Sequence, residues 1–365
     1  MKRLFAVCLS MGLLAGAGYA QPPPSLSVQV PDGSVRLGIT ADVGSACTIQ
    51  WASNLNGTTN WQFLTNLTPL SSSPYLVADT HPVTAPRFYR AFAQQVPANV
   101  VPGPNMVWIP PGTFVMGSPA SEAEREDWWG DDETQHTVTL TQGFYMGKYA
   151  VRQGEYLALM RSNPSRFTTT DNNDNPIPLD LNRPVERVSW SDATNYCARL
   201  TQQELAAGRL PSGWVYRLPT ESEREYACRA GTMTAFSFGS AIHGGMANFY
   251  DYSEYDASIG DIYVANPAVP WLPRTTAVGS YQPNAWGLYD MHGNVWEFCR
   301  DWYGTYPTGS VTDPQGATLG SNRVLRGGSW NYGGRFCRSA VRYCIQPSDW
   351  SSTFGFRVVL APGQP

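Results

Sequence analysis

Apolar and polar residues alternate in short runs through the first hundred residues. Turn clusters rich in Gly, Pro, Asn and Ser separate these runs, whose apolar positions are Leu26, Val28, Val30, Val35, Leu37, Ile39, Cys47, Ile49, Trp51, Trp61, Phe63, Phe88, Tyr89 and Ala91. Alternation with turns every ~8–12 residues is typical of a small antiparallel β-sandwich. We therefore predict an all-β sandwich domain over residues 21–95. Residues 96–105 contain three prolines and no apolar period, and are predicted to be a linker.

From residue 106 onward, three short helical patterns stand among strands and long loops. Residues 220–223, Thr-Glu-Ser-Glu, form a capping box in which hydroxyl and carboxylate satisfy each other's backbone donors, and Gly231 is a suitable helix stop. Ser191 is the predicted N-cap of a helix over 193–207. A weaker pattern predicts a helix over 151–160.

The N-terminus has the pattern of a cleavable secretory signal. Lys2 and Arg3 precede an apolar run over residues 4–17, and small residues at 18 and 20 precede the polar start at Gln21. The run is shorter than the roughly 18 apolar residues of a membrane anchor, the alternative interpretation. We predict a signal peptide over 1–20, no membrane insertion after its cleavage, and a secreted or periplasmic protein.

Composition narrows the possible partners. The chain has 34 Gly, 29 Pro and 13 Trp, so turns and loops dominate, and loops this long are usually functional or held by ions or disulfides. The net charge is −4 and no basic cluster is present, which argues against nucleic acid as a partner.

Six cysteines follow the predicted signal, in a compartment that permits disulfides. Cys47 stands alone in the N-terminal segment and leaves an odd number for the rest. The sequence does not choose among the possible pairings.

Six strings, in this order, resemble the formylglycine-generating enzyme (sulfatase-modifying factor) family. They are Trp108–Gly117, Pro184–Trp190, Arg217–Glu223, Asn284–Glu297, Arg326–Trp330 and Gly355–Arg357. The resemblance covers residues 106–362. It implies an α+β domain with the C-type-lectin-like fold of this family and little regular secondary structure.

Asp290 and Glu297 lie seven residues apart around a glycine turn. Hard cations such as Ca²⁺ take this mixture of carboxylate and backbone oxygens, although a surface turn with two solvated acids would have the same spacing. The resemblance implies a structural calcium here, bound by the side chains of Asp290 and Glu297 and the carbonyls of Gly293 and Val295.

A second family calcium corresponds to Asn248 and Phe249. The family's downstream acid is not at its expected place, where Pro270 stands. A nearby acid would have to replace it: Asp251, Asp256 or Asp261.

The family's enzymes bind copper(I) with two cysteines that follow the Gly-Gly-Ser string, and oxidise a substrate cysteine to formylglycine. Tyr332 takes the first position and Cys337 the second, beyond Ser329. Thiolates suit copper(I), whereas a phenol ionises only near about pH 10. Copper is therefore not expected.

Cys337 has two remaining interpretations: a structural thiol or half-cystine, with Cys228 or Cys299, or a catalytic residue with an unconventional partner in Cys344. The resemblance also matches Cys197 and Cys228 to disulfide cysteines of the animal enzymes. Their partners there correspond to Val358 and Ser339, so those bridges cannot form.

Other chemistries have no support. The four histidines have no metal-ligand spacing, and no Gly-x-Ser-x-Gly elbow, Walker loop or dinucleotide motif is present. The acidic loop over 122–133, which holds Trp128 and Trp129, has two interpretations: a solvated loop with a partly buried aromatic pair, or a ligand contact.

We therefore predict an exported family member that keeps the fold and lacks the copper centre. A groove lined by Ser329, Trp330, Tyr332 and Trp296 would bind a peptide, protein or glycan, with loops held by calcium. The alternative is a formylglycine-generating oxidase that acts on a sulfatase cysteine through Cys337; a purely structural surface protein is a third possibility.

Overall fold

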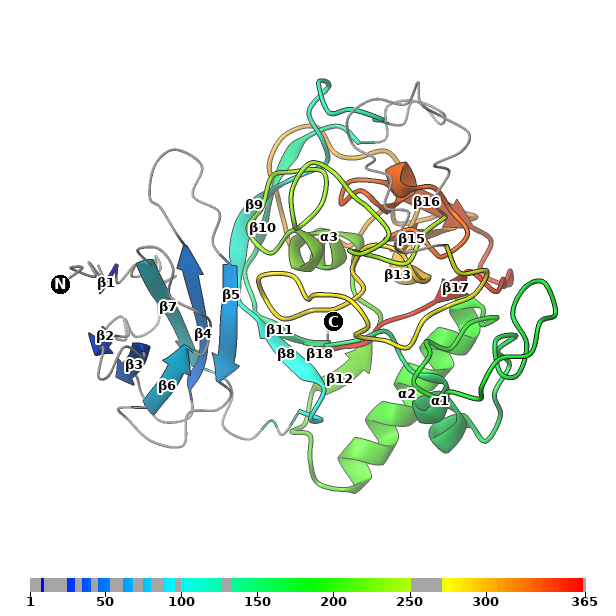
Figure 1. Ribbon diagram of the computed structural model, residues 1–365, viewed down its shortest axis with the longest axis horizontal. Helices are drawn as coiled ribbons and strands as arrows, with labels where there is room; N and C mark the ends of the chain where they lie inside the picture. Colours follow the sequence, from blue (N-terminus) through cyan, green and yellow to red (C-terminus); the bar gives the residue numbers. More distant parts are fainter. Residues whose placement is uncertain are drawn as a thin grey trace. The chain divides into compact units, whose positions relative to one another are not determined.

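The computed structural model divides the chain into two compact units (Figure 1). Unit 1 comprises residues 1–100 with 285–287, and unit 2 comprises residues 101–284 with 288–365. The structure describes residues 8–9, 25–29, 35–40, 45–52, 62–67, 75–79, 88–95, 100, 102–125, 133–250 and 271–363.

Unit 1 contains two sheets. One has the strand order β1-β7-β4-β5 and the other β2-β3-β6. The strands are β1 (Cys8–Leu9), β2 (Ser25–Gln29), β3 (Val35–Thr40), β4 (Ser45–Ala52), β5 (Gln62–Leu67), β6 (Tyr75–Asp79) and β7 (Phe88–Gln95). Five of them lie where alternation predicts a strand; β1 and β6 were not predicted.

The core of unit 1 is apolar and draws on both of its sheets. Its buried members come from β2, β3, β4 and β7: Leu26, Val35, Leu37, Ile39, Cys47, Ile49 and Tyr89. The buried residues of β3 alternate with Arg36, which is exposed. This is the expected consequence of a side-chain period of two. The sandwich domain over 21–95 and the linker over 96–105 remain predictions.

Unit 2 is mostly β, with three sheets of strand order β14-β10-β9, β12-β18-β11-β8 and β16-β15-β13-β17. The strands are β8 (Met106–Ile109), β9 (Gly112–Met116), β10 (His136–Leu140), β11 (Phe144–Gly147), β12 (Trp214–Arg217), β13 (Trp296–Trp302), β14 (Val311–Thr312), β15 (Arg323–Arg326), β16 (Arg342–Ile345), β17 (Phe354–Gly355) and β18 (Val359–Pro362). A short 3-10 helix, η2 (Gly334–Cys337), lies between β15 and β16.

Within the described residues, unit 2 has three α-helices: α1 (Gln153–Met160), α2 (Trp190–Ala206) and α3 (Glu221–Arg229). Thr220 caps α3 in a capping box with Glu223, as predicted. The predicted N-cap of α2 is wrong: Ser189, and not Ser191, accepts from the Asp192 N–H, and the Asp192 carboxylate accepts from the Ser189 N–H. None of the described helices is long and apolar enough to cross a membrane.

Helix α3 packs against β9, β13 and β15, and all nine of its residues are buried although most are polar or charged. Glu225 accepts from the Gly117 N–H and pairs with Arg229 and Arg326. Glu221 pairs with Arg342 at 2.6 Å. Unit 2 therefore encloses a set of paired charges around α3, beside apolar core residues such as Phe298 and Phe356.

Candidate functional site

Residues 290–297 form a tight loop that leads into β13. Asp290, Gly293 and Asn294 have φ values of +54°, +80° and +67°. Gly293 is required here because a Cβ atom would lie 2.3 Å from the Asn248 carbonyl oxygen. The loop is thus fixed in a compact left-handed path beside Asn248.

Glu297 is 1% exposed and accepts hydrogen bonds from two buried arginines. Arg224 Nε lies 2.7 Å from Oε2, and Arg357 Nη2 lies 2.9 Å from Oε1. Burial acts to raise the pKa of Glu297, but Arg224 and Arg357 outweigh it, so its pKa lies below its usual value. The carboxylate is ionised and fully paired.

Asp290 has a different environment. Its Oδ2 accepts from the Gly279 N–H at 2.7 Å, whereas Oδ1 is buried without a partner. Burial raises the pKa of Asp290 to about 6, against the lowering effect of the Gly279 hydrogen bond and of Arg357. Of the two predicted calcium carboxylates, only Asp290 keeps an oxygen for a further ligand.

The predicted calcium ligands do not fit together at Glu297, since guanidinium groups already use both of its oxygens. Among the residues that the structure describes, no group of three or more His, Cys, Asp or Glu side chains is placed to hold a metal.

The second predicted calcium segment lies beside the first. Asn248 donates through Nδ2 to the Arg274 carbonyl and to Asn294 Oδ1, and its own carbonyl accepts from the Asn294 N–H. Phe249 is 2% exposed and packs in a cluster with Cys337. The acids proposed to complete this site (Asp251, Asp256 and Asp261) lie outside the described residues.

At the position of the family's first copper cysteine, Tyr332 is half-buried in an aromatic cluster. Its ring contacts Trp296 at 5.6 Å, Phe336 at 5.5 Å and Tyr343 at 6.1 Å between centroids. Burial, together with Tyr343, raises the pKa of Tyr332 to about 12. The phenol therefore stays protonated near neutral pH.

Cys337, at the second position, is fully buried at 0% exposure. Burial raises the pKa of its thiol. Gly328, with φ +75°, lies so close that a Cβ atom there would be 2.5 Å from the Cys337 sulfur. A protonated thiol in the core and a phenol do not fit copper(I), which needs accessible soft ligands.

Cys228 and His292 form a pair that the sequence reasoning did not identify. The Cys228 sulfur lies 3.6 Å from His292 Nε2 and 3.8 Å from Ser339 Oγ. His292 Nε2 accepts from the Ser237 N–H, so Nδ1 carries the proton that it donates to the Cys337 carbonyl. The structure contains no disulfide among the described cysteines, and predicted pairings remain predictions.

Three of the predicted groove residues are in the core. Ser329, Trp330 and Trp296 are 0%, 1% and 0% exposed. The Trp330 indole donates to the Ser352 carbonyl and its ring packs edge-on against Phe167. These three residues cannot form the walls of an open groove. The aromatic rings of this region that are partly exposed are those of Tyr332, Phe336 and Tyr343.

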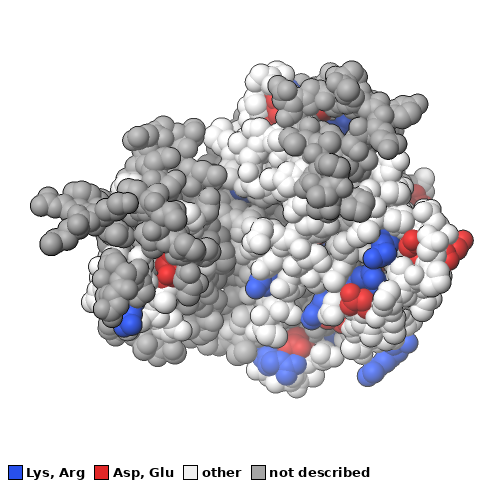
Figure 2. All heavy atoms as spheres, viewed as in Figure 1, with Lys and Arg blue, Asp and Glu red and all other residues white. Residues whose placement is uncertain are grey.

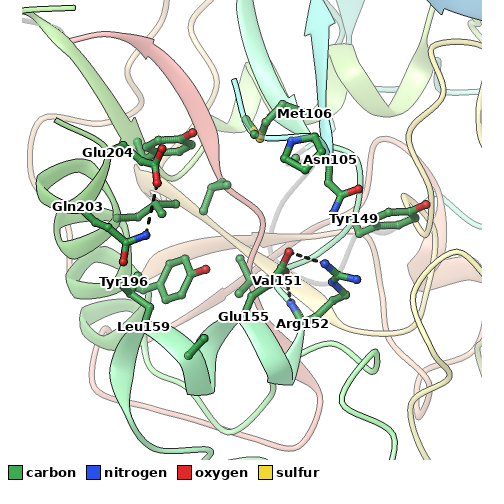
Figure 3. Close-up of a pocket in the computed structure, with 17 residues that line it drawn as sticks. Asn105, Met106, Tyr149, Val151, Arg152, Glu155, Leu159, Tyr196, Gln203 and Glu204 are labelled. Atoms are coloured by element: carbon green, nitrogen blue, oxygen red, sulfur yellow. Dashed lines mark hydrogen bonds and ion pairs between the residues drawn. The ribbon is translucent and has the colours of Figure 1, made fainter. Parts of the chain in front are cut away.

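A separate cavity of about 370 Å³ lies between α1, α2, the strands β8, β11 and β12, and Val358, which precedes β18. Tyr196 extends into it from α2, and the Arg152–Glu155 pair lies at its edge (Figure 3). Its volume is within the range of small-molecule sites, roughly 300–1,000 Å³. The residues that line it are mostly apolar and lie far apart in the sequence, so no sequence motif predicts the cavity.

The sequence reasoning also missed the buried arginines. The Arg338 guanidinium is 0% exposed and pairs with Glu133 and Glu122, at the two ends of the acidic loop over 122–133. On the face shown in Figure 2, the described charges are scattered and form no single-sign patch. Arginines that alternate with glutamates, such as Arg224 between Glu223 and Glu225 in α3, were the available signal.

Comparison with known proteins matches these features to one family. A model of the sulfatase-modifying factor enzyme 1-like domain matches residues 91–362. The chain belongs to this family. Formylglycine-generating enzyme of Mus musculus is 27% identical over 300 residues, which cover 69% of this chain and 74% of the mouse protein.

Two solved structures support the fold of the family domain. PvdO from Pseudomonas aeruginosa has a TM-score of 0.53 at 29% identity, and the match covers 70% of this chain and 93% of PvdO. Treponema denticola variable protein 1 has a TM-score of 0.54 at 26% identity, covering 78% and 99%. The predicted fold family is confirmed; the observed domain is mostly β with few helices.

Proposed function

We propose that the family domain of this chain is a binding module and not a copper-dependent oxidase. The observation that carries the proposal is the pair of residues at the copper position, the phenol of Tyr332 and the fully buried thiol of Cys337. Only one of the two positions carries a sulfur, and that sulfur is closed off from solvent, so the pair of thiolates that would bind copper(I) is incomplete.

The ligand is proposed to be a peptide, protein or glycan that contacts the partly exposed rings of Tyr332, Phe336 and Tyr343. Such rings offer apolar faces, and the phenols add hydrogen-bonding groups. Arg335 lies over the Phe336 ring at 4.8 Å and brings a positive charge to the same surface.

Export is part of the proposal. It rests on the signal pattern of residues 1–20, and it places the protein outside the cytoplasm, secreted or periplasmic.

The competing function is oxidation of a sulfatase cysteine through Cys337 and Cys344. It is favoured by relatives that are named formylglycine-generating enzyme. It is disfavoured by the position of Cys337 in a cluster with Ala235, Phe236 and Phe249, away from solvent.

Copper(I) titration of the purified protein, followed by mass spectrometry of a cysteine-containing sulfatase peptide, separates the two functions. We expect no stoichiometric copper and an unmodified peptide, for the wild type and for Cys337→Ser alike. Stoichiometric copper that Cys337→Ser abolishes, together with peptide oxidation, would refute the binding proposal.

A glycan array and a peptide library test the binding itself. Binding that Tyr332→Ala and Tyr343→Ala weaken about tenfold or more is the expected result, because aromatic anchors dominate such contacts. Trp350→Ala is the matched control, since this exposed ring stacks on Arg187 outside the Tyr332 cluster. No binding in either screen would count against the proposal.

A further inference from the structure

Two buried guanidinium groups hold the loop over residues 289–297. Arg224 and Arg357 are 1% and 0% exposed, and both form ion pairs with Glu297. Arg224 comes from α3 and Arg357 precedes β18, so the contact joins three distant parts of the chain.

The same arginines bind main-chain oxygens of the loop. Arg224 Nη2 lies 3.0 Å from the Met291 carbonyl oxygen, and Arg357 Nη2 lies 2.7 Å from that of Tyr289. Arg357 Nη1 also donates to the Gly147 carbonyl on β11 at 2.7 Å. A carboxylate and several carbonyls are the oxygens that a hard cation takes in proteins. Here guanidinium N–H groups bind the Glu297 carboxylate, which is a predicted calcium ligand, and the neighbouring carbonyls of Tyr289 and Met291, which are not.

The local charge leaves little room for a divalent ion. Arg224 and Arg357 already balance the two buried carboxylates of the loop, Glu297 and Asp290, and in a buried site an added Ca²⁺ would be repelled by both arginines. A desolvated cation needs an opposite charge that is not already paired. Glu297 has none to offer.

The remaining predicted ligands are too few. Calcium takes about 6–8 oxygens. The Gly293 carbonyl already accepts from the Val295 N–H at 3.0 Å, and of the predicted carboxylate oxygens only Asp290 Oδ1 has no partner.

The first glycine of the Gly327-Gly328 string leaves space for the Arg224 side chain. Gly327 has φ +101°, and a Cβ atom there would lie 2.8 Å from Arg224 Nη2 and 3.3 Å from the Met291 carbonyl oxygen. The Gly327 carbonyl accepts from the Gly293 N–H at 2.6 Å. The glycine therefore lets Arg224 and the loop meet at close range.

We propose that Arg224 and Arg357 perform in this chain the structural role that the family resemblance assigns to calcium at residues 290–297, so that the loop folds without a metal ion. The proposal does not depend on what the domain binds.

The decisive experiment compares the full chain in EGTA with the chain in calcium chloride. We expect the same thermal unfolding midpoint in both solutions and the same hydrogen exchange in peptides that span residues 289–297. Calorimetric titration should show no calcium binding that this loop could account for. A midpoint that falls in EGTA and is restored by calcium, with faster exchange in these peptides, would overturn the proposal.

The variant Arg224→Met tests whether the arginine itself holds the loop in place. It removes the charge and leaves Glu297 with one guanidinium, so exchange at 289–297 in EGTA should become about a hundredfold faster or more. Arg209→Met is the matched control: this arginine also pairs with a glutamate, Glu204, but is 46% exposed, and its loss should change exchange at the loop by less than about threefold.

An Arg224→Met protein as protected as the wild type would refute the role of the arginine. If the variant does not fold, the wild-type comparison in EGTA and calcium decides the matter alone.

Discussion

The two units of this protein differ in the charged groups that their cores enclose. The core of unit 1 consists of Val, Leu, Ile and Tyr side chains from its two sheets. The centre of unit 2 is a charged helix, α3, whose glutamates meet arginines from β15 and β16. An apolar core tolerates local repacking, whereas a buried ion pair depends on both partners being present. The two units should therefore respond differently to equivalent changes.

The largest loss of stability is expected from the substitution Arg326→Met. Arg326 is 2% exposed and pairs with Glu225, which is itself fully buried. Its loss leaves a buried carboxylate short of a partner, at a cost of about 3–5 kcal/mol. Urea unfolding followed by hydrogen exchange should show the loss in unit 2 peptides only. An equal loss in unit 1 peptides would contradict the division into independent cores.

Glu186 sharpens the comparison, because this buried carboxylate of unit 2 is held by main-chain groups and not by an arginine. Its Oε1 accepts from the Phe167 N–H at 3.0 Å, and Oε2 has no partner. Burial raises its pKa to about 8, although the Phe167 and Arg166 N–H groups lower it.

Because the pKa of Glu186 is raised in the folded protein, its protonated carboxyl contributes fully to stability at pH values below its pKa in the unfolded chain. This contribution to the free energy of unfolding is lost as the pH rises toward about 8. Glu186→Gln imitates the protonated acid. Relative to the wild type it should be neutral at pH 5 and more stable at pH 8, by up to about 1.4 kcal/mol per pH unit crossed. Thermal unfolding across this range checks the sign; parallel pH curves for the two proteins would exclude Glu186 as the titrating group.

The smallest effect belongs to unit 1. Ile49 is 0% exposed in the apolar cluster, and Ile49→Val removes one methylene at a cost of about 0.5–1.5 kcal/mol. Exchange should quicken in unit 1 peptides and stay unchanged in α3. A loss as large as that of Arg326→Met would erase the contrast between the two cores.

Local patterns predicted the elements better than their edges. The capping box at Thr220 and the strands around Val35 and Ile49 are where the sequence places them. Strand β6 was missed because its alternation is masked: Leu76 is 66% exposed, while Asp79 is buried and accepts from the Tyr89 hydroxyl at 2.8 Å.

The candidate site was predicted only in part. The sequence indicated the loop over 290–297 and the exchange of a cysteine for Tyr332. It did not indicate that Trp296 and Trp330 are buried, since exposure depends on what packs above a ring. Nor did spacing reveal the cavity beside Tyr196, whose walls come from separate elements.

The sequence by itself determined the family, the capping box at Thr220, and the absence of the family's first copper cysteine at Tyr332, because each depends on residue identity or on contacts a few positions apart. Only the tertiary structure decided which cation each buried carboxylate meets. Glu297 meets Arg224 and Arg357 across separations of 73 and 60 residues, and no local rule fixes such a pairing. It is set when the chain encloses these charges and each must find a partner away from water.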